Sequence, residues 1–274
     1  MLSRLELDGL GAPADIARRI HELAPALPLN FMIEDICRQL DIESIEEKPV
    51  TSFEAMLLMD ANKAWGAIVL AEGRRAERRR FSIAHELGHF LIPTHKPRPG
   101  EEFRCSIDHL RIGDLRQHDR RQRIEAEANR FAAHLLMPPA RIRSEHNSRR
   151  PDLREVVRLA SEFGVSREAM ARGYIEAHRQ TLAVVIMRDG HIDRIYRDDA
   201  FPWIEPRYGQ PTPADSIAAD HRLQPGHFSE MEECEPDTWL GEYGARRVEV
   251  LSEQFLVQQN GWTTVLLHAE MSDD

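Results

Sequence analysis

The chain has 274 residues, 42% hydrophobic and 30% charged, which is typical of a globular protein with one large domain or two modest ones. Its net charge of −10 argues against a dedicated nucleic-acid binder, and it has no run of about eighteen apolar residues that could span a membrane. The three cysteines form no CxxC pair, and the N-terminus lacks the pattern of a secretory signal. We therefore expect a cytoplasmic protein without disulfides or a cysteine zinc site.

The charge is unevenly distributed along the chain. Residues 181–274 carry 7 Lys and Arg against 18 Asp and Glu, a net charge of −11, which leaves residues 1–180 close to neutral. The acidic character therefore belongs to the C-terminal third alone.

The first predicted elements are two short helices and a hairpin. Residues 13–24 and 31–40 both place apolar side chains at helical spacing. Two apolar runs of strand length follow, at residues 53–59 and 64–70, and turn-forming residues join them. This pattern predicts an antiparallel β-hairpin.

The sequence His85-Glu86-x-x-His89 lies in the next predicted helix, within residues 81–91. Because residues i and i+4 lie one above the other on a helix, both imidazoles can reach one metal ion. Glu86 lies next to the first of them and can hold and deprotonate a water molecule there. The motif alone leaves two interpretations open: a metal site, or a core-edge helix that carries two surface histidines.

The flanks of this helix carry further signals. We expect Ser82 to cap its N-terminus and Pro93 to end it. The basic segment at residues 74–80 is interpreted as a solvated connection rather than a nucleic-acid contact. Residues 93–118 form a long predicted loop between two candidate metal-binding helices, where a loop that covers a substrate would be useful.

A second predicted helix, at residues 120–137, offers a third ligand. At about 100° per residue, Glu125 lies at the edge of the apolar face, whereas Glu127 lies in a polar sector. Asn129 follows Glu125 by one turn and is placed to hydrogen-bond a ligating imidazole. Two histidines and a glutamate would leave the fourth position of a zinc ion open. The alternative for Glu125 is an ordinary salt bridge with a nearby arginine.

Residues 153–179 have the spacing of a helix-turn-helix. An amphipathic stripe is followed by a turn at Gly164-Val165 and by Ser166, which can cap a second helix. Three arginines could face a phosphate backbone: Arg167, Arg172 and Arg179. We favour packing or partner recognition over DNA contact for this segment.

Residues 181–274 predict a small domain rich in β-strands. Asp189-Gly190 separates one pair of apolar runs, and Asn260-Gly261 separates another. These dipeptides are strong signals for tight hairpin turns. We therefore expect mostly antiparallel pairing in this domain.

Two segments, Arg80–Leu91 with its HExxH motif and Ile124–Pro138 (IEAEANRFAAHLLMP), resemble the ImmA/IrrE metallopeptidase family. The resemblance covers roughly residues 25–145. It implies a gluzincin-like zinc site with His85, His89 and Glu125 as ligands, Glu86 as general base and Asn129 as a hydrogen-bonding companion. Members of the family cleave repressors or antitoxins, commonly helix-turn-helix proteins, and so release stress, phage or mobile-element genes.

The resemblance also implies an α+β fold. We expect a zincin-like peptidase core of helices and a small antiparallel sheet in residues 1–145, a helix-turn-helix-like helical segment in 146–180, and an acidic, mostly antiparallel β domain with a sensor-like regulatory role in 181–274. As in similar peptidases, the strand at residues 65–70 would pair with an extended peptide. The helix-turn-helix domain with which some relatives begin is absent here, so direct DNA binding is not expected.

These observations predict a zinc-dependent endopeptidase that cleaves a helix-turn-helix repressor or antitoxin. One alternative is a non-catalytic protein that uses the metallopeptidase fold as a platform to bind a regulator. Another is a closed structural zinc site with four protein ligands. The second donor to the oxyanion stays open among His95, His109, His118 and Tyr174.

Overall fold

The computed structural model describes residues 2–96, 103–105, 120–146, 150–219 and 224–272. Contacts group the chain into two compact units. Unit 1 comprises Met1–Pro138 and Ser161–Ser166, and unit 2 comprises Pro139–Ala160 and Arg167–Asp274. The predicted division at residues 145 and 180 into parts with separate roles stays a prediction. Within the described segments, no helix has the length and apolar character needed to cross a membrane.

Unit 1 combines helices with a small sheet, and the α+β class is confirmed. Its elements are α1 (Pro13–Leu23), α2 (Ile33–Gln39), β1 (Ile42–Lys48), β2 (Ala55–Met59), β3 (Gly66–Ala71), α3 (Ala76–Leu91), β4 (Phe103–Cys105) and α4 (Arg120–Leu136). The strand order in the sheet is β1-β3-β2-β4. Strands β2 and β3 form the predicted hairpin, in which Leu57 pairs with Ile68.

Two expectations about this sheet are wrong. The sheet is mixed rather than antiparallel, because β1 pairs in parallel with β3, for example Ile45 with Ile68. Strand β3 consequently lies between β1 and β2, so the strand at residues 65–70 has no open edge at which a peptide could pair. The local sequence pattern shows a hairpin, but it does not show that an earlier strand occupies the hairpin's other side.

Helix α3 begins earlier than predicted. It starts at Ala76, so Ser82 is a buried residue inside the helix rather than its N-cap, and most of the basic segment is helical. The arginines of this segment are good helix formers and pair with acids of unit 1. Arg78 bonds the buried Glu54 at 3.0 Å, and Arg79 bonds Glu47 at 2.7 Å. Such pairs favour the first turns of a helix that carries the metal motif farther along.

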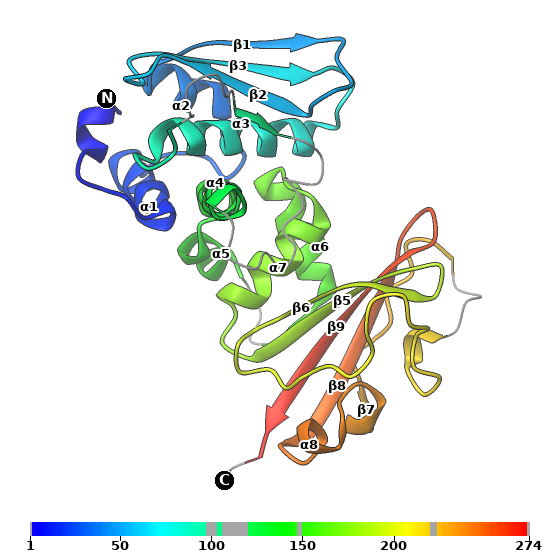
Figure 1. Cartoon of the computed structure of the whole chain (residues 1–274). Coiled ribbons are helices and arrows are strands. Elements are labelled where there is room, and N and C mark those ends of the chain that lie inside the picture. Colours follow the sequence, from blue (N-terminus) through cyan, green and yellow to red (C-terminus); the bar gives the residue numbers. More distant parts are fainter. Residues whose placement is uncertain (1, 97–102, 106–119, 147–149, 220–223, 273–274) are drawn as a thin grey trace. The chain divides into compact units, whose positions relative to one another are not determined.

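The buried part of α3 packs between the sheet and α4 (Figure 1). Gly88 permits this close approach, since a Cβ atom there would lie 2.8 Å from Cδ1 of Phe131 on α4. The apolar stripe predicted for α4 is buried as expected: Ile124, Ala128, Phe131, Ala132, Leu135 and Leu136. This packing brings side chains of α4 against the motif of α3. The loop predicted at residues 93–118 lies largely outside the described residues.

Unit 2 consists of a five-stranded sheet with helices. Its elements are α5 (Pro139–Glu145), α6 (Leu153–Phe163) up to Ala160, α7 (Arg167–Ala177), β5 (Thr181–Arg188), β6 (His191–Arg197), β7 (Glu232–Cys234), α8 (Glu242–Ala245), β8 (Val248–Val257) and β9 (Trp262–Met271). The strand order is β6-β5-β9-β8-β7, and all pairs are antiparallel. Both predicted hairpins are present. At their turns Asp189, Gly190, Asn260 and Gly261 all have positive φ, which explains these residue types.

Both faces of this sheet are covered. Ala183, Val185 and Met187 of β5 belong to a core that includes the fully buried Trp239. The alternate residues of β5 (Leu182, Val184 and Ile186) are also buried, and α7 packs against this strand. A strand buried on both faces carries a continuous apolar run, which is the pattern seen in its sequence.

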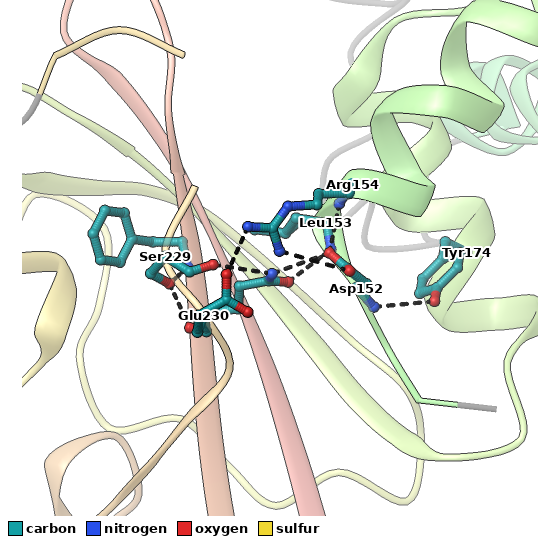
Figure 2. Close-up of polar contacts among 8 residues, drawn as sticks. Asp152, Leu153, Arg154, Tyr174, Ser229 and Glu230 are labelled. Atoms are coloured by element: carbon teal, nitrogen blue, oxygen red, sulfur yellow. Dashed lines mark hydrogen bonds and ion pairs between the residues drawn. The ribbon is translucent and has the colours of Figure 1, made fainter. Parts of the chain in front are cut away.

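The start of the helix-turn-helix-like segment is bound to the sheet of unit 2. Asp152 precedes α6 and accepts a hydrogen bond from the backbone N–H of Arg154 at 2.8 Å, in the manner of an N-cap (Figure 2). The amide of Gln254 in β8 completes the cap, because it accepts from the Leu153 N–H at 2.7 Å and donates to Asp152 Oδ1 at 3.0 Å. Gln254 also donates to the carbonyl of Ser229 at 3.2 Å.

Two of the three arginines considered for phosphate contact lie against strands or turns of unit 2. Arg167 donates to Oε1 of Gln258 at 3.3 Å. The Arg172 guanidinium carbon lies 5.8 Å from the centre of the Tyr196 ring. Glu168, on the same helix, accepts from Arg194 at 2.6 Å. These contacts support packing rather than DNA recognition as the role of α7.

We expect Gln254→Leu to lower the free energy of unfolding by about 1–3 kcal/mol, because buried groups at the start of α6 would lose their hydrogen-bond partner. Urea titration of the full chain measures this loss. Gln258→Leu is the matched control, since Gln258 is partly exposed and should contribute less. Equal losses in both variants would contradict the capping role of Gln254.

Candidate metal centre

Three donor atoms from two helices meet in the interior of unit 1. Helix α3 supplies His85 and His89, and α4 supplies Glu125; all three side chains are buried. The two Nε2 atoms lie 3.0 Å apart. Glu125 Oε2 lies 3.2 Å from Nε2 of His85 and 3.6 Å from Nε2 of His89.

This spacing fits a metal ion. Ligand atoms at about 2.0–2.1 Å from a tetrahedral zinc ion are separated from one another by about 3.3 Å. The three separations observed here bracket that value. Within the described part of the chain, this is the group of three His, Cys, Asp or Glu residues whose donor atoms lie close enough to share an ion. The three residues can therefore hold a metal ion, whereas their assignment as zinc ligands stays a prediction.

The electrostatics of the site suit a cation. Burial lowers the pKa of His89 to about 4, so near neutral pH its imidazole is uncharged and can offer a lone pair. Burial raises the pKa of Glu125, but the two imidazoles beside its carboxylate outweigh this effect and hold that pKa well below its usual value. Glu125 is therefore ionised. Two imidazoles and one carboxylate form a donor set typical of catalytic zinc sites.

Asn129 and Glu86 lie where the sequence places them. Asn129 is buried one turn after Glu125, and its Oδ1 accepts a hydrogen bond from Nδ1 of His85 at 2.9 Å. This bond places the proton of His85 on Nδ1 and leaves the Nε2 lone pair facing the other two donors. Glu86 is fully buried on α3 between the two histidines in sequence. Its role as general base stays a prediction.

Comparison with known proteins agrees with this geometry. Residues 57–173 match the model of the Peptidase M78 family, described as the IrrE N-terminal-like domain. The chain carries an IrrE-like domain. The resemblance to the ImmA/IrrE family is thereby confirmed, and the matched range contains both histidines and Glu125.

The fold has a counterpart among solved structures. A Mycobacterium tuberculosis transcriptional regulator superposes with a TM-score of 0.58 and 16% identity, over 94% of this chain and 75% of that one. At this identity the likeness concerns the fold alone. No curated protein matches the chain.

The IrrE-like domain also contains two polar residues whose place the sequence did not indicate. His95, considered above only as an oxyanion donor, is fully buried, and its Nδ1 lies 3.1 Å from Nδ1 of His89. Glu127, expected in a polar sector, is partly buried and lies 2.9 Å from Nε2 of His95. No spacing rule links these residues, because His95 follows the end of α3 and Glu127 lies on α4.

Lys63 supports the end of the motif helix. Its amino group is buried and donates to the carbonyl oxygens of His89 at 2.8 Å and Ile92 at 2.7 Å. A donor at the carbonyl end of a helix satisfies groups that lack partners within the helix. Lys63 therefore helps to hold the turn of α3 that carries His89.

His109 and His118 lie outside the described residues. Tyr174 belongs to unit 2, where its hydroxyl accepts from the backbone N–H of Asp152 at 3.3 Å (Figure 2).

Proposed function

We propose that this chain is a zinc-dependent endopeptidase that cleaves a regulatory protein, a helix-turn-helix repressor or an antitoxin, and so controls gene expression in a stress, phage or mobile-element response. The observation that carries the proposal is the convergence of His85, His89 and Glu125 at zinc-like spacing beside Glu86. The match to an M78 peptidase domain supports hydrolysis of peptides as the chemistry.

The residues of the site suit peptide hydrolysis. Zinc, when bound by His85, His89 and Glu125, supplies Lewis-acid activation of a water molecule and of the substrate carbonyl. Glu86 accepts a proton from the attacking water as the oxygen–carbon bond forms. When the carbon–nitrogen bond breaks, Glu86 passes this proton to the leaving amine. Burial of the site excludes bulk water and so strengthens each of these interactions.

Zinc is the proposed ion because of the donor types. Imidazole nitrogen suits zinc and other late transition metals, whereas magnesium and calcium take mainly oxygen ligands. The chain has no CxxC pair, so a site of histidines and a carboxylate is the best-supported one.

The substrate class rests on the family resemblance. The structural counterpart is a transcriptional regulator, which is in line with a regulatory role for this chain. Unit 2 would then recognise the partner or sense a signal, without direct DNA binding. The cytoplasm, where repressors and antitoxins act, is the proposed location.

The rival proposal is a protein that binds a regulator without cutting it. The experiment that separates the two incubates the full zinc-loaded chain with repressors encoded beside its gene and looks for fragments by mass spectrometry. We expect discrete fragments that disappear when a chelator removes the zinc. Tight binding of a repressor without any cleavage would favour the rival.

A further inference from the structure

The two histidines proposed as ligands differ in what contacts their Nδ1 atoms. His85 donates directly to Asn129 Oδ1, over 2.9 Å. Nδ1 of His89 instead faces a nitrogen of another imidazole, Nδ1 of His95, at 3.1 Å. The far nitrogen of His95, Nε2, faces Oε2 of Glu127 at 2.9 Å. These contacts form one line from a partly exposed carboxylate to a buried imidazole.

The position of each proton in this line follows from the carboxylate. An ionised carboxylate only accepts hydrogen bonds, so Nε2 of His95 must carry the proton and donate it toward Glu127. A neutral His95 then has a lone pair on Nδ1, which can only accept. Nδ1 of His89 must therefore carry a proton and donate to His95. Nε2 of His89 is left with a lone pair, directed toward Nε2 of His85 and Oε2 of Glu125.

The opposite tautomer of His89 would break this line of hydrogen bonds. If His89 carried its proton on Nε2, its Nδ1 would need a donor from His95, whose remaining nitrogen would then present a lone pair to the Glu127 carboxylate. Two acceptors would face each other over 2.9 Å. Because His95 is fully buried, water cannot readily relieve this contact.

We propose that Glu127 and His95 are positioning residues that hold His89 in the tautomer with its Nε2 lone pair facing the metal centre. This proposal rests on the proposed function, because the lone pairs on Nε2 of His89, Nε2 of His85 and Oε2 of Glu125 face one another and a metal ion would share them. Partners of this kind, behind a ligand, typically account for about 10- to 100-fold in metal affinity. Here the carboxylate acts through an interposed histidine, so its influence extends from the edge of α4 to the buried ligand.

The test measures the tautomer of His89 and the metal affinity separately. The first readout is 15N NMR of histidine side chains in the metal-free full chain, which distinguishes a protonated ring nitrogen from one with a lone pair. The second is the dissociation constant for Zn²⁺, obtained by competition with a chelator. The variants are Glu127→Leu, Glu127→Gln and His95→Phe, and thermal unfolding checks that each one folds.

We expect Glu127→Leu and His95→Phe to give mixed tautomers of His89 and to weaken Zn²⁺ binding by about 10- to 100-fold. Glu127→Gln keeps a carbonyl that accepts from His95, so its loss should be smaller and the tautomer largely retained. The control is Glu34→Leu, because Glu34 is a partly exposed glutamate of unit 1 whose carboxylate pairs with Arg79. It should change neither readout.

An unchanged tautomer and an unchanged affinity in both Glu127→Leu and His95→Phe would overturn the proposal. A weaker affinity with the wild-type tautomer retained would also overturn it, since the residues would then act only through packing. A wild-type chain with the expected tautomers that binds no Zn²⁺ would support the positioning role and contradict the proposed function instead.

Discussion

Glu86→Gln is expected to lower the rate of peptide cleavage by about 10²- to 10⁴-fold while leaving zinc bound, because the amide cannot accept the proton of the attacking water. The two side chains have nearly the same shape, so the buried position on α3 tolerates the change. Rates of fragment formation under single-turnover conditions and the zinc content of the purified variant provide the two measurements.

The matched control for this variant is Glu77→Gln, an exposed glutamate in the first turn of the same helix. It removes one carboxylate from α3 without touching the site and should cleave at the wild-type rate. If Glu86→Gln retained both zinc and full activity, Glu86 would not be the general base. A variant that still binds the repressor and no longer cuts it would provide a substrate trap.

Glu125→Ala should lose more zinc affinity than any change at Glu127. It removes a donor atom that lies 3.2 Å and 3.6 Å from the two imidazoles, and the remaining pair of histidines forms an incomplete site. We expect the zinc affinity to fall by more than about 100-fold, which is the upper end of the range for residues that hydrogen-bond to a metal ligand. Competition with a chelator measures this affinity. Added zinc should raise the thermal unfolding temperature of the wild type but not that of Glu125→Ala.

Two further variants isolate the cause of this loss. Glu125→Gln keeps the volume of the side chain and removes its charge, so a strong loss there excludes a cavity as the reason. Glu127→Ala, on the same helix, should lose much less. Equal losses for Glu125→Ala and Glu127→Ala would contradict the assignment of Glu125 as the third ligand.

Much of the candidate site follows from helical periodicity. The spacing of His85 and His89 requires that they share a face of any helix that contains them. The 100° rotation per residue directs Glu125, and not Glu127, toward the apolar side of α4. In unit 2, the Asp-Gly and Asn-Gly dipeptides mark both hairpin turns, because these residues readily adopt positive φ.

Other features could not be read from local patterns. The local pattern places the start of α3 too late, because the arginines of residues 74–80 are typical of a solvated segment. The acids with which they pair come from α2, β1 and the residue before β2. The parallel partner of β3 does not follow from the local pattern for a related reason. Pairing between strands separated along the chain depends on contacts that a short window does not contain.

The sequence by itself determined which side chains can act as ligands and which helix faces they occupy, because local geometry depends on neighbouring residues in the chain. Only the tertiary structure decided how close α3 and α4 come, through the contact of Gly88 with Phe131. It also decided that His95 contacts His89 and that Glu127 contacts His95. These positions are set by packing between segments distant in sequence, where a single ångström separates a hydrogen bond from no contact at all.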